Sequence, residues 1–169
     1  MISKTITLGS PDATRMFGQA LAAIVAQGDT IGLVGPLGAG KSLLARSIIQ
    51  ELMGRQIDVP SPTYTLVEQY ESERGPICHL DLYRLSSVQE ALNIGLDDML
   101  ESTICLIEWA DKVASTLPST TLLLSISAVD ETTNNASVNS AKNADAPRQL
   151  MVVADNVWQE RLERSNIFS

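Results

Sequence analysis

Positive charge is scarce in this sequence. Its 169 residues contain 12 lysine and arginine side chains against 20 aspartate and glutamate side chains, which gives a net charge of −8. A protein that grips a nucleic-acid backbone unaided gains affinity from cationic contacts, and attraction to anionic lipid surfaces has the same requirement. The charge balance therefore argues against autonomous binding to nucleic acid and against membrane binding. An anion bound by this chain has to be held by a concentrated local site.

Long apolar runs, cysteines and aromatic residues are also few. The longest apolar run, residues 20–26, falls well short of the ~18–20 residues that span a bilayer. Residues 1–8 lack the apolar stretch of a signal peptide. Cys78 and Cys105 each lie in an apolar run, which predicts buried, reduced thiols in a cytoplasmic protein. Because aromatic residues make up only 4% of the chain, the core has to consist mainly of Leu, Ile, Val and Ala.

The remaining composition fits one globular domain over residues 1–169, since 44% of the residues are apolar. Strand-like and helical patterns alternate along the chain, which predicts a three-layer α/β domain. The hairpin-like stretch 63–81 indicates that the sheet is mixed rather than purely parallel. Residues 130–147 are rich in Asn and cannot bury enough apolar surface to fold, so we expect a mobile loop there. We predict strands at 3–8, 30–34, 63–70, 77–81, 103–108, 121–126 and 149–153, and helices at 11–27, from the glycine loop to Gly54, at 87–100 with a break at Gly95, and at 156–165.

The sharpest signal is GPLGAGKS at residues 35–42, which fits G-x-x-x-x-G-K-[ST] at every fixed position. An apolar strand precedes this motif and a periodic helix follows it. Glycines let successive N–H groups converge on a phosphate, and the helix adds the positive end of its dipole. Lys41 would place its charge on the β- and γ-phosphates, and the Ser42 hydroxyl would ligate Mg²⁺. A glycine-rich turn with a solvated lysine is the alternative.

A nucleoside triphosphatase of this kind also needs an acidic residue at the end of a nearby apolar strand, to hold the metal ion and its water. Asp81 follows the run ICHL, and Glu108 follows the run ICLI. The second run is the more uniformly apolar, so we expect its strand to lie beside the strand that precedes the glycine loop. Glu108 is then expected in the metal shell, with Asp81 as a second acidic partner of the metal or the attacking water.

Four other positions each allow two interpretations. Residues 61–65 are either a switch segment whose hydroxyls sense the γ-phosphate or a proline-braced entry to a strand. His79 has Cys78 on the opposite strand face, so we expect a core residue or a neighbour that supports the site, not a metal ligand. Arg84 either offsets phosphate charge or makes a surface ion pair. Trp109 is expected to flank the site, either by packing or through a nucleotide-sensitive contact.

Four segments stand out in this order along the chain: GPLGAGKS at 35–42, SPTYTLV at 61–67, HLDLYRL at 79–85 and EWAD at 108–111. Taken together, they resemble the TsaE family, small bacterial P-loop ATPases required for making threonylcarbamoyladenosine in tRNA. The resemblance runs in consistent order from the first predicted strand to about residue 127, and the set is more specific than the glycine loop alone. It implies a P-loop NTPase-like three-layer domain with a mixed, mainly parallel central sheet.

The resemblance implies a site for ATP and Mg²⁺. Lys41, Asp81 and Glu108 are the implied catalytic residues, and Ser42, Glu108 and Asp81 are the implied metal residues. The choice of ATP over GTP follows from the resemblance, since the sequence has no Asn-Lys-x-Asp guanine signature. The implied nucleotide-binding residues, with Pro11 and Arg148 as candidates near the base, are Pro11, Gly35, Leu37, Gly38, Ala39, Gly40, Lys41, Ser42, Leu43, Thr63 and Arg148.

The family works with two partner proteins, TsaB and TsaD, so the resemblance implies that tRNA is met only indirectly, through their complex. This accords with the acidic net charge. The sequence departs from the family pattern at Pro36, where Asp is usual, and at Ser42, where Thr is usual. Serine keeps the ligand oxygen, whereas Pro36 removes one N–H and one carboxylate, so we expect affinity or turnover to differ.

Two other functions stay open on the same fold. A small-molecule kinase needs a lid that carries several arginines, whereas the Asn-rich stretch offers only Lys142 and, at its edge, Arg148. A nucleotide-gated binding module with little catalysis would instead use order and disorder of residues 61–65 to present a partner surface.

Overall fold

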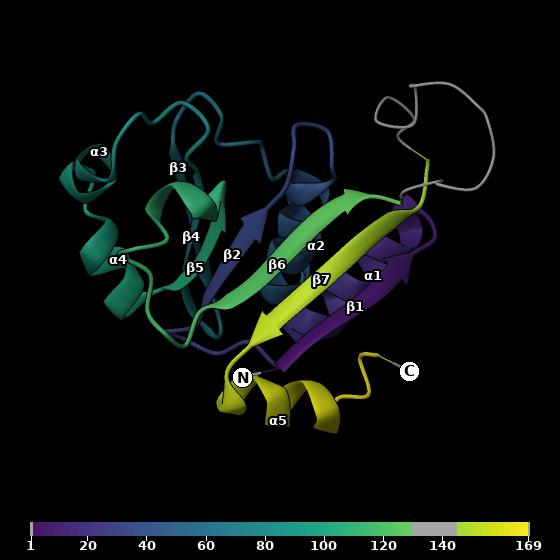
Figure 1. Ribbon diagram of the computed structural model, residues 1–169. Coiled ribbons are helices and arrows are strands. Elements are labelled where there is room, and N and C mark those ends of the chain that lie inside the picture. Colours follow the sequence, from purple (N-terminus) through teal and green to yellow (C-terminus); the bar gives the residue numbers. More distant parts are fainter. Residues whose placement is uncertain (1, 130–144, 169) are drawn as a thin grey trace, which may run out of the picture.

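A seven-stranded sheet forms the middle layer of the structure (Figure 1). The structure is a computed structural model and describes residues 2–129 and 145–168. The strand order is β1-β7-β6-β2-β5-β4-β3. Strands β1, β6, β2, β5 and β4 run in one direction, while β7 and β3 run against them. The predicted mixed, mainly parallel sheet is confirmed. The strands are β1 (Ile2–Leu8), β2 (Thr30–Val34), β3 (Val67–Ser72), β4 (Gly75–Asp81), β5 (Ile104–Glu108), β6 (Leu122–Ala128) and β7 (Arg148–Ala154).

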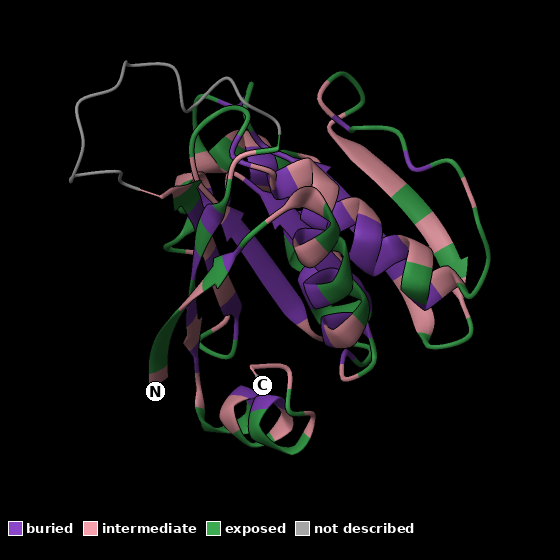
Figure 2. Ribbon diagram, turned by 90° about the vertical axis from the view of Figure 1, so that its right-hand side faces the viewer, coloured by how far each residue is buried: buried purple, intermediate pink, exposed green. Residues whose placement is uncertain are grey.

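Helices cover both faces of the sheet, and each face has its own apolar core. One core joins the sheet to α1 (Pro11–Ala22), α2 (Lys41–Met53) and α5 (Asn156–Arg164). The other joins it to α3 (Val88–Asn93), α4 (Leu96–Ser102) and the short 3₁₀ helix η1 (Ala110–Val113). Figure 2 shows the buried residues running along the middle strands and the inner sides of the helices. Both faces of the central strands are therefore shielded from solvent, which explains their nearly continuous apolar sequences.

The strand that precedes the glycine loop, β2, lies at the centre of the sheet between β5 and β6. This confirms the prediction that the strand ending at Glu108 is its neighbour. The next strand along is β4, and the register pairs Asp81 with Glu108 and Leu33 with Glu108. The carboxyl ends of β2, β5 and β4 thus meet at one edge of the sheet, which is where ligands bind in open α/β folds.

Local chemistry sets several helix boundaries as predicted. The Ser10 hydroxyl accepts from the N–H of Ala13 and caps α1, and Pro11 occupies its first turn. Gly95 adopts a left-handed conformation (φ 86°) between α3 and α4, so the predicted break is confirmed.

Two predicted boundaries are wrong. Helix α1 ends at Ala22 rather than near residue 27. The N–H groups of Ile24 and Val25 bond only three residues back, to the carbonyls of Leu21 and Ala22. The Arg74 guanidinium donates to the carbonyls of Ala22, Ala23 and Val25 at this end of the helix. Residues 63–66 are turns rather than strand, because Leu66 is left-handed (φ 68°) and its N–H bonds to the carbonyl of Pro62.

The Asn-rich stretch predicted as a mobile loop lies mostly outside the described residues, which resume at residue 145 and lead into β7. Among the described helices, none is both long and apolar enough to span a bilayer.

Candidate functional site

The glycine loop joins β2 to α2 and forms an open cradle. Gly35 (φ 146°) and Gly40 (φ 109°) both have backbone conformations that side chains rarely adopt. A Cβ atom on Gly35 would lie only 2.2 Å from the carbonyl oxygen of Ile126, whereas a Cβ on Gly40 would point into open space. Gly40 is also the N-cap of α2 and offers no side-chain acceptor. The first N–H groups of α2 therefore lack a side-chain cap, as a phosphate-binding helix requires.

Lys41, the first residue of α2, is almost fully buried, with 4% of its surface exposed. Its Nζ atom donates to the carbonyl oxygens of Gly35 at 2.7 Å and Pro36 at 2.9 Å. The same ammonium lies 4.0 Å from the ring centre of Trp109. Burial lowers the pKa of Lys41, and the nearby Glu108 and Asp81 carboxylates offset this only in part. The ammonium is thus poorly solvated and is bound by neutral carbonyl oxygens beside an aromatic ring.

Two buried carboxylates face the loop from the ends of neighbouring strands. Glu108 is 1% exposed, and its Oε2 atom accepts a 2.7 Å hydrogen bond from the Ser42 hydroxyl. Asp81 is 4% exposed, and its Oδ2 atom accepts from the Thr63 hydroxyl at 2.8 Å. Its Oδ1 atom accepts from the backbone N–H of Tyr83 at 2.9 Å. The orientation of both carboxylates is fixed by these contacts.

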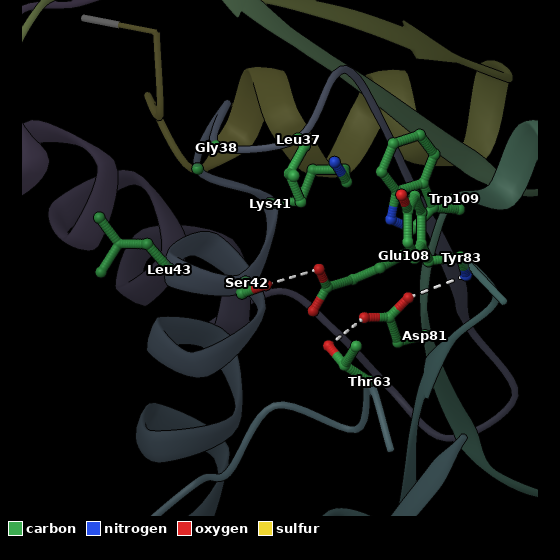
Figure 3. A pocket seen from close by; sticks show the side chains of 11 residues that line it. Leu37, Gly38, Lys41, Ser42, Leu43, Thr63, Asp81, Tyr83, Glu108 and Trp109 are labelled. Atoms are coloured by element: carbon green, nitrogen blue, oxygen red, sulfur yellow. Dashed lines mark hydrogen bonds between the residues drawn. The ribbon is translucent and has the colours of Figure 1, made fainter. Parts of the chain in front are cut away.

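These groups line one cavity of about 280 Å³, which Figure 3 shows from close by. Most of the residues predicted for phosphates and metal lie on its wall. Gly35 and Ala39 belong to the loop but not to this wall. The lining residues are Leu37, Gly38, Gly40, Lys41, Ser42, Leu43, Thr63, Asp81, Tyr83, Glu108 and Trp109.

A second cavity of about 190 Å³ lies on the other side of the loop and shares Gly38, Gly40 and Leu43 with the first. Pro11 and Arg148, the two candidates for contact with the base, both line it. The Nε atom of Arg148 donates to the carbonyl of Ala39 at 3.2 Å, across 109 positions of sequence. The fold therefore brings both residues to the loop, in a position continuous with the phosphate cradle.

Three aromatic or imidazole side chains complete the surroundings of the cavity. Trp109 flanks the site as predicted, and its ring centre lies 5.0 Å from that of Tyr83, at an angle of 46°. Tyr83 has no role in the sequence prediction, although it follows Asp81 by two residues. His79 is buried as predicted, and its Nε2 atom lies 2.8 Å from Oε1 of Glu108. Side chains two positions apart lie on the same face of a strand, so the sequence HLD indicates that His79 faces the same way as Asp81.

Of the remaining candidates, Arg84 is exposed and makes no ion pair within residues 2–129 and 145–168, so the surface ion pair is not found. In the segment 61–65, Thr63 points into the cavity and also meets the Ser61 hydroxyl at 2.8 Å. Tyr64 is 86% exposed beside it. The segment is thus a turn anchored on Asp81 and open to solvent.

The donor set of the cavity fits a magnesium nucleotide. Carboxylate and hydroxyl oxygens are hard ligands that suit Mg²⁺, which usually takes one or two carboxylates and fills its remaining positions with water and substrate phosphates. Across the described part of the chain, no three His, Cys, Asp or Glu side chains gather in a way that could hold a metal ion by themselves. Ser42 and Glu108 therefore match a cation that arrives with a polyphosphate.

A central parallel strand, a glycine loop, a helix that opens with Lys-Ser and a carboxylate at the end of the adjacent strand define the P-loop NTPase-like class. The family model described as "Threonylcarbamoyl adenosine biosynthesis protein TsaE" matches residues 8–137. The chain belongs to the TsaE family.

Individual relatives agree with this assignment. The chain is 38% identical over 151 residues to a protein of Haemophilus influenzae, a match that covers 83% of this chain and 95% of the relative. It is 32% identical over 131 residues to a protein of Rickettsia bellii, covering 78% and 91%. Both are named tRNA threonylcarbamoyladenosine biosynthesis protein TsaE. The crystal structure of Bacillus subtilis YdiB has the same fold, with a TM-score of 0.72, 23% identity and coverage of 98% of this chain and 95% of the other.

Proposed function

We propose that this chain binds ATP with Mg²⁺ and hydrolyses it in support of the complex that makes threonylcarbamoyladenosine in tRNA. The observation that best supports this proposal is the contact of Ser42 with Glu108 at the end of the glycine loop, with Asp81 on the neighbouring strand. This arrangement places a hydroxyl, two carboxylates and a buried ammonium around one cavity of about 280 Å³. The family membership supports the biological setting, because the relatives are named for that modification.

The loop and Lys41 account for phosphate binding. Uncapped N–H groups of α2 converge on the cradle, and the ammonium of Lys41 is held at its edge by the carbonyls of Gly35 and Pro36. An incoming γ-phosphate offers charged oxygens in place of those neutral carbonyls, and hydrogen bonds between charged partners are about twice as strong. The base would lie in the adjoining cavity, beside Pro11 and Arg148.

Ser42 and Glu108 would hold the magnesium ion, whose charge would neutralise the β- and γ-phosphate oxygens. Asp81 is the residue best placed to orient the attacking water. Thr63 and the backbone of Tyr83 donate to its two oxygens and fix the plane of the carboxylate. A carboxylate held in that way can accept a hydrogen bond from water and take up its proton as the bond to phosphorus forms.

The partners of this function are proteins similar to TsaB and TsaD, and tRNA is met only through them. The net charge of −8 supports this division of labour, since the chain need not hold tRNA itself. Cys78 and Cys105 are free and buried, which suits the reducing cytoplasm.

Calorimetric titration with ATP, in Mg²⁺ and then in EDTA, tests the binding step. Lys41→Ala should abolish the heat of binding, and Lys4→Ala, a lysine that lies over the Phe168 ring, is the matched control and should retain it. Hydrolysis is then measured alone and with TsaB and TsaD, together with formation of the modified nucleoside. Absence of nucleotide binding, or modification that proceeds equally well with Lys41→Ala, would overturn the proposal. Transfer of phosphate to an acceptor other than water would assign the fold to a kinase instead.

A further inference from the structure

The imidazole of His79 contacts Glu108 through the carboxylate oxygen that does not bind Ser42. His79 is on β4 and Glu108 is at the end of β5, and His79 is 1% exposed. Its Nε2 atom lies 2.8 Å from Oε1 of Glu108, while Oε2 of the same carboxylate accepts from Ser42. Each oxygen of Glu108 therefore has its own partner, one on the strand side and one on the loop side.

Which ring nitrogen carries the hydrogen follows from the metal-binding role proposed for Glu108. A carboxylate that ligates a metal ion can only accept, so in that role Nε2 is the donor to Oε1. The other nitrogen, Nδ1, is buried and has no partner among the described residues. Buried polar atoms without partners are rare, because each costs free energy relative to a paired or apolar group. An apolar residue would pack in this place without that cost. We infer that the contact made by Nε2 offsets the cost of the unpartnered Nδ1.

We propose that His79 is a positioning residue that holds the Glu108 carboxylate in the rotamer required for the magnesium ion. This inference rests on the proposed function, since it assigns a role at the same site. A glutamate has three side-chain torsions, and a ligand that is free to rotate loses entropy when it binds a metal. The bond from His79 restricts those torsions beforehand and keeps Oε2 directed at Ser42. Hydrogen-bond partners of metal ligands typically change metal affinity or activity by about 10- to 100-fold when they are removed.

Two amide variants separate positioning from packing. In His79→Gln the side-chain N–H lies about as far from the backbone as Nε2, so it can still donate to Glu108. In His79→Asn the amide ends nearer the position of Nδ1 and cannot reach. Both variants are polar and similar in size, so they share the cost of replacing the ring. Cys78→Ala, on the same strand but the opposite face, controls for a general loosening of β4.

The readout is the ratio of ATP affinity in Mg²⁺ to ATP affinity in EDTA, measured by calorimetry, with Mg²⁺ titrations of hydrolysis as a second measurement. His79→Asn should lower the ratio by about 10- to 100-fold and leave binding in EDTA unchanged. His79→Gln and Cys78→Ala should keep ratios close to that of the original protein. If His79→Asn does not fold, His79→Phe fills the ring volume without a donor and is expected to show the same loss.

Equal ratios for the Asn, Gln and original proteins would overturn the inference, as would a loss shared by the Gln and Asn variants. Both results are distinct from failure of the proposed function. That failure would show already in the unsubstituted protein, as absence of ATP binding or absence of any tightening by Mg²⁺.

Discussion

The Ser42 hydroxyl donates a 2.7 Å hydrogen bond to Oε2 of Glu108, across 66 positions of sequence. The bond joins the first turn of α2 to the end of β5, and it satisfies a carboxylate that is 1% exposed. In the proposed function these two oxygens, Oγ of Ser42 and Oε2 of Glu108, would coordinate the cation. The fold itself brings the two proposed ligand groups into contact, and the bond pairs a buried oxygen of Glu108.

The first prediction concerns the Ser42 hydroxyl itself. Ser42→Ala removes one oxygen ligand and leaves Oε2 of Glu108 without its partner, so we expect the Mg²⁺ concentration for half-maximal ATP hydrolysis to rise by about 10- to 100-fold. Ser42→Thr keeps the oxygen and should stay within a few-fold of the original protein. Steady-state hydrolysis over a Mg²⁺ series measures both. An Ala variant with an unchanged Mg²⁺ requirement would show that Ser42 is not a ligand.

The second prediction tests whether Asp81 acts in the hydrolysis step rather than in ATP binding. Asp81→Asn keeps the shape of the side chain and removes its charge and basicity. If Asp81 orients water and accepts its proton, kcat should fall by about 10²- to 10⁴-fold while ATP affinity changes little.

Asp111→Asn is the matched control for that experiment. Asp111 is exposed, does not line the cavity, and still contributes to the charge felt by Lys41. The control variant should hydrolyse ATP at close to the original rate. A fall of similar size in both variants would point to a general effect of charge rather than to a role for Asp81.

The third prediction uses Trp109 as a reporter. Its ring centre lies 4.0 Å from Nζ of Lys41, so nucleotide binding that draws the ammonium toward phosphate must change the surroundings of the indole. We expect ATP to alter tryptophan emission in the original protein and in Trp158→Phe, and to lose this effect in Trp109→Phe. Trp158 is 2% exposed and donates to the carbonyl of Thr120, in the core that includes α5.

Calorimetry on the same variants checks that the Trp109→Phe protein still binds. A cation–π contact at such a site contributes about 0.5 to 2 kcal/mol, so the ATP affinity of this variant should change by no more than about 30-fold. An emission change that survives in Trp109→Phe and disappears in Trp158→Phe would place the nucleotide elsewhere.

Features of the fold that are set by residues adjacent in the sequence are predictable from the sequence. The Ser10 cap, the break at Gly95 and the glycine loop each follow from the chemistry of a few consecutive residues. The predicted start of β3 at residue 63 is too early, because Leu66 adopts a left-handed conformation that its residue type disfavours. That conformation is supported by a tertiary bond, from the N–H of Asp81 to the carbonyl of Leu66.

Contacts between distant strands could be predicted only in part. The apolar run before Glu108 correctly indicated a neighbour of β2, because a strand buried on both faces belongs at the centre of the sheet. The contact of His79 with Glu108 needs β4 beside β5, and no local signal fixes that order. The insertion of β7 antiparallel between β6 and β1, which carries Arg148 to the loop, has no local signal either.

The fourth prediction concerns the thiol of Cys105. It is fully buried on β5, in register with Cys78 on β4. Burial raises the pKa of Cys105 from 9.0 to about 11, against a smaller opposing effect of the hydrogen bond with Thr103. A thiol reagent at pH 8 should therefore react with Cys105 at least about 100-fold more slowly in the native protein than in an unfolded chain, because burial both raises the pKa and blocks access. Time courses with and without urea measure this, and fast labelling of the native protein would contradict it.

The same pKa predicts how stability changes with pH. Because the folded pKa lies above the unfolded one, the stabilising contribution of the neutral thiol is complete below about pH 9 and is lost as the pH rises toward 11. Between pH 8 and 10.5 the original protein should lose about 2 kcal/mol more unfolding free energy than Cys105→Ala. Lys41 and Tyr70 also have shifted pKa values, but both are present in the two proteins, so their contributions cancel in the difference. Urea unfolding of both proteins over this range is the measurement, and parallel pH profiles would mean that the thiol ionises as readily in the fold as in the unfolded chain.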